Sequence, residues 1–131
     1  MHLLLLAAFG GAIGAGLRYL VNQALAGPDI VGGVAAFPWA TLTVNVAGGF
    51  LMGVVFVVVN ERLGGSPEWR TILATGILGG LTTFSAFSLD MLNLMIDDGV
   101  NLRFFAYTIG SVVLAFAALV VGLWFARAVL T

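Results

Sequence analysis

Residues 39–59 read WATLTVNVAGGFLMGVVFVVV and contain no charged side chain. A helix needs roughly 20 predominantly apolar residues to cross the hydrocarbon core of a bilayer. This stretch therefore predicts a transmembrane helix. It lies inside a longer uncharged segment, which is bounded by Asp29 on one side and by Glu61 on the other.

Three further segments are similarly apolar, and only the first of them contains a charge, that of Arg18. The segments are 3–25, 71–89 and 104–126. We therefore predict an all-α membrane protein with one transmembrane domain over residues 1–131. Its helices are expected at about 3–25, 39–59, 69–96 and 103–127. Only Met1 and His2 precede the first leucine run, whereas a signal peptide begins with a basic segment, so we expect this helix to be retained.

The composition supports lipid as the surrounding solvent, because 61% of residues are hydrophobic and only 8% are charged. Soluble domains average about 25% charged residues. The net charge of -1 offers no basic stripe, so nucleic acid is not an expected partner. Cysteine is absent and His2 is the only histidine, which excludes disulfides, thiol nucleophiles and histidine-based metal or catalytic clusters. With no nucleophile–base set in view, we do not expect an enzyme.

Arginines near the span ends normally set the orientation of a membrane protein. Four spans place both termini on one side, which then carries three arginines: Arg62, Arg70 and Arg127. The other side carries Arg103, and also Arg18 if that side chain reaches outward. This small bias leaves two alternatives open. The chain could insert in a single orientation, or it could insert in both orientations and form an antiparallel dual-topology homodimer.

Small residues recur at four-residue spacing in three of the predicted helices. The pairs are Gly10/Gly14, Gly49/Gly53 and Gly76/Gly80. Such spacing lets helix backbones approach closely in a membrane. The contacts that it predicts could lie within one subunit or between two subunits. We expect a dimer in either case, since four helices alone enclose little room for a solute.

Polar side chains inside the predicted spans need an explanation, because they are costly in lipid. Thr41 and Asn45 share a face of the second helix, and the Asn45 amide could donate to an anion or join two helices. On the fourth helix, Tyr107 and Ser111 share a face in the same way. They could extend a polar track or serve only in packing.

The third helix contains the most unusual pattern, GGLTTFSAFS at residues 79–88. Paired glycines followed by hydroxyl residues disfavour a continuous helix. We therefore predict that this helix is broken near Gly79 and Gly80, although a continuous helix with close packing remains an alternative. The hydroxyls of Thr83, Ser85 and Ser88 could continue the polar track.

Two phenylalanines in this pattern, Phe84 and Phe87, share a helix face. Their rings could offer positive edges to an anion, or simply face lipid or the core. No carboxylate lies near the middle of any predicted span, and Arg18 is the only central charge. A proton-coupled pump or cation exchanger normally needs an intramembrane carboxylate, so these features favour an anion pathway.

Three motifs together resemble the Fluc fluoride channels, also called the CrcB family. GGAIGAGLRY at 10–19 is similar to the family's GGxxGxxxRY opening, and TLTVNVAG at 41–48 is similar to its TLxVNxxG segment. GGLTTFSAFS at 79–88 resembles the family's GGxTTFSTFS signature. The motifs occur in family order and span essentially the whole chain.

The resemblance implies a passive fluoride channel in the plasma (inner) membrane that exports fluoride from the cytoplasm and lowers its toxicity. It implies an antiparallel dual-topology homodimer with two pores. Phe84 and Phe87 would line each pore, and Asn45 would hydrogen-bond the ion. Gly79 and Thr82 would offer backbone carbonyls from both subunits to a structural Na⁺ at the dimer axis. Tyr107 and Ser111 would lie on the polar track of the fourth helix, and Arg18 would lie near the vestibule.

The sequence departs from the family pattern at three positions. Ala86 replaces the threonine between the two phenylalanines, and Asp90 stands where a glutamate is usual. Ala115 occupies a position where a further hydroxyl of the track would be expected. Two other functions stay open, a small four-helix multidrug or cation exchanger and a non-transporting membrane assembly subunit. The exchanger would need a carboxylate inside the first helix, which has none.

Overall fold

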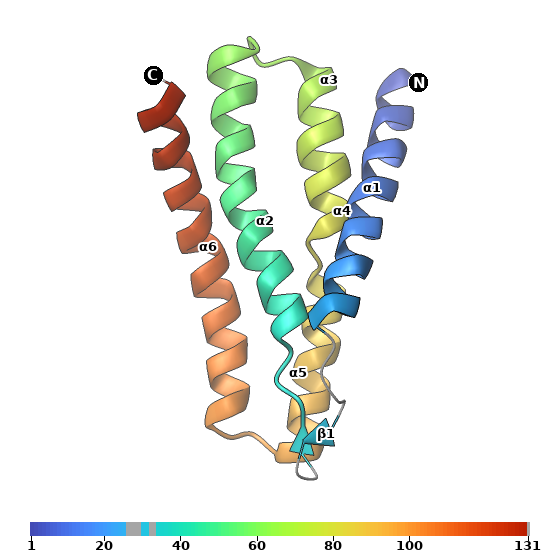
Figure 1. The fold of residues 1–131 in the computed structure, drawn as a ribbon, viewed down its shortest axis with the longest axis vertical. Coiled ribbons are helices and arrows are strands. Elements are labelled where there is room, and N and C mark those ends of the chain that lie inside the picture. The colour runs from blue at the N-terminus through green and yellow to red at the C-terminus, as the bar shows by residue number, and fades with distance from the viewer. Residues whose placement is uncertain (26–29, 32–33, 131) are drawn as a thin grey trace.

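The computed structural model describes residues 1–25, 30–31 and 34–130 and is helical over nearly all of them (Figure 1). The first span is α1, His2–Leu25. The second is α2, Trp39–Val57, which continues into a π-helical turn η1, Val58–Arg62. The third comprises α3 Pro67–Trp69, the π-helical η2 Arg70–Leu78, α4 Gly79–Leu81 and α5 Phe84–Asp98. The fourth is α6, Leu102–Leu130.

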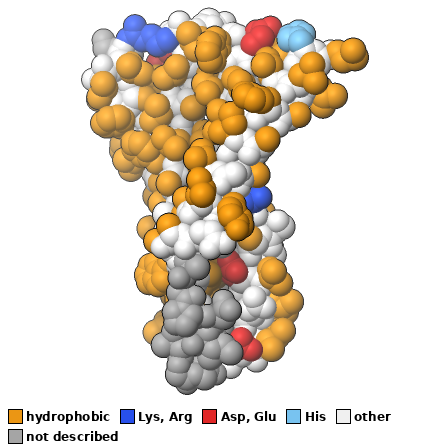
Figure 2. All heavy atoms as spheres, turned by 45° about the vertical axis from the view of Figure 1, so that its right-hand side comes forward, with side chains coloured by type: hydrophobic (Ala, Val, Ile, Leu, Met, Phe, Trp, Pro, Cys, Tyr) orange, Lys and Arg blue, Asp and Glu red, His pale blue; other side chains and the backbone are white. Residues whose placement is uncertain are grey.

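All four spans are long and apolar enough to cross a membrane, so the prediction of an all-α protein with four membrane helices is confirmed. Both termini lie at the same end of the bundle (Figure 1). Hydrophobic side chains cover much of the lateral surface visible in Figure 2. Leu4 is 70% exposed and Phe116 68% exposed, which is expected of surfaces that contact lipid or another subunit.

The connections between spans are short. Between α1 and α2, β1 Ile30–Val31 pairs antiparallel with β2 Val34–Ala35. Residues 26–29 and 32–33 of this connection lie outside the described part. Between η1 and α3, Gly64 and Gly65 adopt positive φ angles of 62° and 74°, which glycine reaches without steric cost. The Ser66 hydroxyl then caps α3 by accepting from the N–H of Trp69 at 3.4 Å.

The helical path of the third span is interrupted at Thr82 and Thr83. Thr82 has φ −79° and ψ 154°, and Thr83 has φ −151° and ψ 124°, so both residues are extended. The sequence-based prediction placed a break near Gly79 and Gly80, but both glycines are helical in α4. The interruption comes after them, where side chains supply hydrogen bonds that replace the helical ones.

Glycines allow close contact in two pairs of helical segments, α1 with η2–α4 and α2 with α6. Gly10 and Gly14 of α1 face the η2–α4 segment, where Gly76 lies against Gly10. Gly53 of α2 faces Leu119 of α6, while Gly122 of α6 faces Phe50 of α2. Six of the predicted small-residue positions thus pack helices within one subunit: Gly10, Gly14, Gly49, Gly53, Gly76 and Gly80. Close backbone contact of this kind stabilises helix pairs where lipid removes the hydrophobic driving force.

We expect Gly122→Ala to destabilise the α2–α6 pair strongly. A β carbon at Gly122 would lie 2.0 Å from the Phe50 carbonyl oxygen, so the helices must separate. Overpacking of this kind typically costs about 1–3 kcal/mol. Gly110→Ala on the same helix is the matched control, since no atom lies within 4 Å of its β carbon. Thermal unfolding in detergent, followed by circular dichroism, should separate the two variants; equal midpoints would contradict the packing.

The bundle is wider at the end that carries the termini (Figures 1 and 2). All four spans run side by side there, whereas α5 and the first turns of α6 continue beyond the lower ends of α1 and α2 (Figure 1). An exposed pair, Glu61 and Arg127, joins η1 to α6 at the wide end through two hydrogen bonds of 2.9 and 2.8 Å. The described part of the molecule is therefore wedge-shaped and narrows toward the end that carries α5 and the start of α6 (Figure 1).

Candidate functional site

A groove of about 430 Å³ lies between α2, α6 and the interruption in the third span. Six of the predicted site residues line it: Asn45, Thr82, Thr83, Phe84, Phe87 and Ser111. No charged side chain is among its lining residues. The remaining wall is made of glycines and apolar side chains, including Met52 and Leu119. The groove thus combines a small neutral polar surface with an apolar one.

Asn45 holds the interrupted backbone. Its Nδ2 donates to the Thr83 carbonyl at 3.0 Å, and its Oδ1 accepts from the Thr83 N–H at 2.8 Å. These two bonds pair one side-chain amide with one extended residue, replacing the helical partners that Thr83 lacks. An amide nitrogen carries two N–H donors, so this pairing leaves the second donor for the groove. Asn45 therefore links two helices and also lines the groove, and its donation to an anion stays a prediction.

The hydroxyl of Thr83 caps the helix that follows. Its Oγ1 accepts from the Ala86 N–H at 3.1 Å and lies 3.2 Å from the Ser85 hydroxyl. Ser88 donates back to the Phe84 carbonyl at 2.9 Å, within α5. Ser85 and Ser88 do not line the groove, so their predicted place on the polar track remains untested by this geometry.

The interruption also removes the usual hydrogen-bond donors of two backbone carbonyls, those of Gly79 and Thr82. In a helix, the Gly79 carbonyl would accept from the Thr83 N–H, and the Thr82 carbonyl from the Ala86 N–H. Thr83 N–H instead donates to Asn45, and Ala86 N–H donates to the Thr83 hydroxyl. Gly79 is itself exposed on α4 and does not line the groove, whereas Thr82 lines it. The two carbonyls predicted to bind Na⁺ have therefore lost their usual helical donors.

The two phenylalanines differ sharply in environment. Their ring centroids are 5.5 Å apart with planes tilted by 46°. Phe87 is only 5% exposed and packs against the Tyr107 ring at 5.4 Å, whereas Phe84 is 76% exposed. Phe87 thus forms a fixed wall of the groove, while Phe84 projects from the subunit. Their helical spacing predicted a shared face but gave no sign of this difference.

Tyr107 is fully buried beside the groove and does not line it. Its hydroxyl donates to Asp90 Oδ2 at 3.0 Å, and the Thr41 side chain interacts with the same hydroxyl. The Asp90–Tyr107 pair could not be predicted from the sequence, because the two residues are 17 positions apart on different helices. Met52 and Leu119 were not predicted either, although each lies at helical spacing from a predicted residue, Asn45 and Ser111 respectively.

Ser111 is the polar residue of α6 that reaches the groove. It is 4% exposed, and its Oγ has no hydrogen-bond partner among the described residues. A buried hydroxyl without a partner loses the bonds that water would give it, so it is a ready donor for a ligand. One turn later Ala115 lines the same groove with a methyl group. The polar wall therefore ends at Ser111.

Arg18 is the one predicted site residue on α1, and it lies outside the groove. It is half-buried, and no ion pair or hydrogen bond joins it to the described residues. No cluster of three carboxylate or imidazole side chains occurs in the described part of the chain.

Four apolar spans and an uncharged groove at a helix interruption define a multi-pass α-helical membrane protein. The profile of the CrcB-like protein family (Camphor Resistance, CrcB) matches residues 5–123, so the chain belongs to that family.

Curated relatives match the chain over nearly its whole length. A protein of Mesorhizobium japonicum is 47% identical over 130 residues, which cover 97% of this chain and 98% of the relative. One of Chelativorans sp. is 48% identical over 130 residues, covering 99% and 100%. One of Hahella chejuensis is 46% identical over 123 residues, covering 94% and 93%. Each of the three carries the name fluoride-specific ion channel FluC.

Proposed function

We propose that this protein is a fluoride channel, not an enzyme, and that it lets fluoride leave the cell passively across the plasma membrane. The observation that carries the proposal is the uncharged groove at the interruption of the third span. An amide, hydroxyls and phenyl rings meet there, on a chain that belongs to the CrcB-like family. The names of the relatives supply the identity of the ion.

The chemistry of the groove suits a small, strongly hydrated anion. An isolated ion in a low-dielectric medium loses tens of kcal/mol of solvation, which the protein must replace. A conducting pore must do so with groups that hold the ion weakly enough to release it. The second Asn45 N–H, the unpartnered Ser111 hydroxyl and the positive ring edge of Phe87 are neutral donors of this kind.

The placement of carboxylates argues against a proton-coupled exchanger. Such transporters bind and release protons on an acid within the substrate pathway. No acid lines the groove, and Asp90 accepts a hydrogen bond from buried Tyr107 outside it. We therefore rank the exchanger, and the assembly subunit that conducts nothing, behind the channel.

The channel is proposed to work as an antiparallel dual-topology homodimer. One subunit supplies only part of a pore, since Phe84 is 76% exposed at the edge of the groove. The wide end of one wedge would lie beside the narrow end of an inverted copy (Figure 2). The ends also differ in charge, because α5 ends at Asp97 and the Asp98–Arg103 pair, whereas Arg62 and Arg70 lie at the other end with Glu68 and the Glu61–Arg127 pair.

A structural Na⁺ at the axis of this dimer fits the donor set. Unwound carbonyls in broken membrane helices are typical ligands for Na⁺. The Gly79 and Thr82 carbonyls have lost their usual helical donors, and exposed Gly79 is open to a second copy. Two copies would supply four such oxygens. The ion would stabilise the contact between the two third spans without entering the fluoride path.

We expect the purified protein in detergent to have twice the mass of one chain by light scattering. Replacing Na⁺ with a large organic cation throughout purification and reconstitution should sharply lower fluoride flux, because the unwound carbonyls would repel one another across the axis. Restoring Na⁺ should restore flux. A monomer, or full flux without any Na⁺, would contradict this part of the proposal.

The function itself is tested with purified protein in liposomes that contain both fluoride and chloride. A potassium ionophore allows charge balance, and ion-selective electrodes record each anion. Fluoride efflux without chloride efflux is the expected result. Proton-coupled uptake of an organic cation would establish the exchanger instead, and liposomes that release nothing would favour the assembly subunit.

A further inference from the structure

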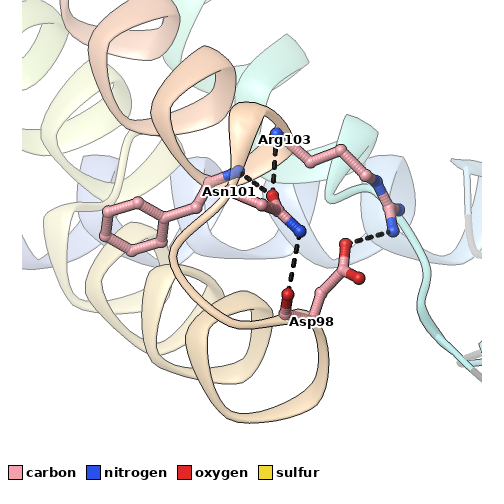
Figure 3. Close-up of polar contacts among 4 residues, drawn as sticks. Asp98, Asn101 and Arg103 are labelled. Carbon is pink, nitrogen blue, oxygen red and sulfur yellow. Dashed lines mark hydrogen bonds and ion pairs between the residues drawn. The ribbon is translucent and has the colours of Figure 1, made fainter.

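The turn between α5 and α6 carries three polar residues that the proposed pathway does not use (Figure 3). Asp98 ends α5, Asn101 precedes α6, and Arg103 lies in the first turn of α6. Arg103 Nη1 lies 2.9 Å from Asp98 Oδ2 and forms an ion pair with it. The chain reverses through Gly99, whose φ is 71°. We call Asp98, Asn101 and Arg103 the interhelical clamp.

Asn101 bonds to both helices at once (Figure 3). Its Oδ1 accepts from the N–H groups of Arg103 at 2.9 Å and of Phe104 at 3.1 Å, which caps α6. Its Nδ2 donates to the Asp98 carbonyl at 2.9 Å. The first N–H groups and the last C=O groups of a helix have no intrahelical partners. The Asn101 side chain accepts from N–H groups of α6 and donates to a C=O group of α5, so it satisfies both. The end of α5 and the start of α6 are thereby fixed relative to each other.

A second link joins the same two helices further into the membrane. Tyr107 lies four residues after Arg103, on the same face of α6. Its hydroxyl donates to Asp90, which lies on α5 eight residues before Asp98. The clamp and the Tyr107–Asp90 bond are therefore two successive links between α5 and α6.

The second link reaches the groove through Phe87, which lines it. The Tyr107 ring packs 5.4 Å from the Phe87 ring, and Phe87 lies 5.5 Å from Phe84. Ser111, one turn after Tyr107, brings its unpartnered hydroxyl to the same groove. A displacement of the first turn of α6 would thus move both Ser111 and the support behind Phe87.

From this chain of contacts we infer that Asp98, Asn101 and Arg103 are positioning residues for ion permeation. By fixing the start of α6 against the end of α5, they set the separation between the Phe87 ring and the Ser111 hydroxyl. The clamp residues do not themselves bind the ion. This inference rests on the proposed fluoride channel and assigns a role to residues outside its pore.

The test measures single-channel fluoride current in planar bilayers, together with the fraction of dimeric protein. Asn101→Ala removes the cap of α6 and the bond to Asp98, so we expect the unitary current to change by about threefold or more. A residue that only stabilised the fold would alter the number of active channels and leave the current through each one unchanged. That second result would overturn the inference.

Two further variants complete the design. Asn101→Asp loses the donor to Asp98 but keeps an acceptor for α6 and adds a negative charge that is favourable at a helix N-terminus, so its unitary current should change in the same direction by a smaller factor. Arg127→Gln breaks the Glu61–Arg127 pair at the opposite end of the bundle and should leave the unitary current at the wild-type value. If the wild-type protein carried no fluoride current, the proposed function would fail; normal currents in both Asn101 variants would reject the clamp alone.

Discussion

Replacing Phe84 with isoleucine is expected to reduce fluoride flux by up to about tenfold while leaving the subunit folded. The ring is 76% exposed, so the subunit itself depends little on it. Isoleucine keeps the apolar bulk and loses the positive ring edge. Aromatic edge interactions are worth about 0.5–1.5 kcal/mol, and 1.4 kcal/mol in a barrier is a tenfold change in rate.

Liposome efflux under the proposed assay measures the effect, and the elution volume of the purified dimer checks assembly. Phe9→Ile is the matched control, because Phe9 is also exposed, at 64%, but lies on α1 outside the groove. Phe87→Ile should lose flux too. The flux lost by Phe87→Ile is harder to interpret, because this variant also loses the packing against Tyr107. Normal flux through Phe84→Ile with an intact dimer would take this ring out of the pathway.

The Asn45→Asp substitution is expected to reduce fluoride flux by about a thousandfold at neutral pH. An ionised carboxylate still accepts from the Thr83 N–H, but it cannot donate to the Thr83 carbonyl or to an anion. Two like charges 4 Å apart repel by about 4 kcal/mol at an effective dielectric constant of about 20. That repulsion corresponds to roughly a thousandfold in rate.

Asn60→Asp makes the same chemical change at the exposed end of the bundle, where Asn60 accepts from Arg70 at 3.0 Å. It should conduct normally. Asn45→Ala is informative for a different reason, because it leaves both Thr83 backbone groups without partners. We expect it to lower the yield of folded dimer. Unchanged flux through Asn45→Asp would exclude Asn45 from the ion path.

The polar residues of the third span illustrate how far the sequence could be interpreted. Glycines followed by hydroxyls correctly marked an unusual helix, and Asn45 stood out as an amide within an apolar run. The extended residues are nevertheless Thr82 and Thr83, after the glycines. Their position depends on Asn45, which is 38 residues away from Thr83. Local propensity cannot encode the location of such a distant partner.

The two phenylalanines and the acid near them show the same limit. Phe84 and Phe87 have equivalent helical spacing, yet one is exposed and the other buried. Contact with Tyr107 of α6 makes that difference. Asp90 was noted in the sequence only because the family usually has a glutamate there, whereas α6 makes it the acceptor of a buried hydroxyl. Each of these roles comes from a neighbouring helix.

The sequence by itself determined that this chain is a membrane protein of four helices, because insertion depends on the summed transfer free energy of consecutive residues. This sum can be calculated from consecutive residues without any knowledge of tertiary contacts. Only the tertiary structure decided where the third span opens and which neutral groups meet in one groove. Those features depend on hydrogen bonds and ring contacts between distant residues, which form when the helices pack.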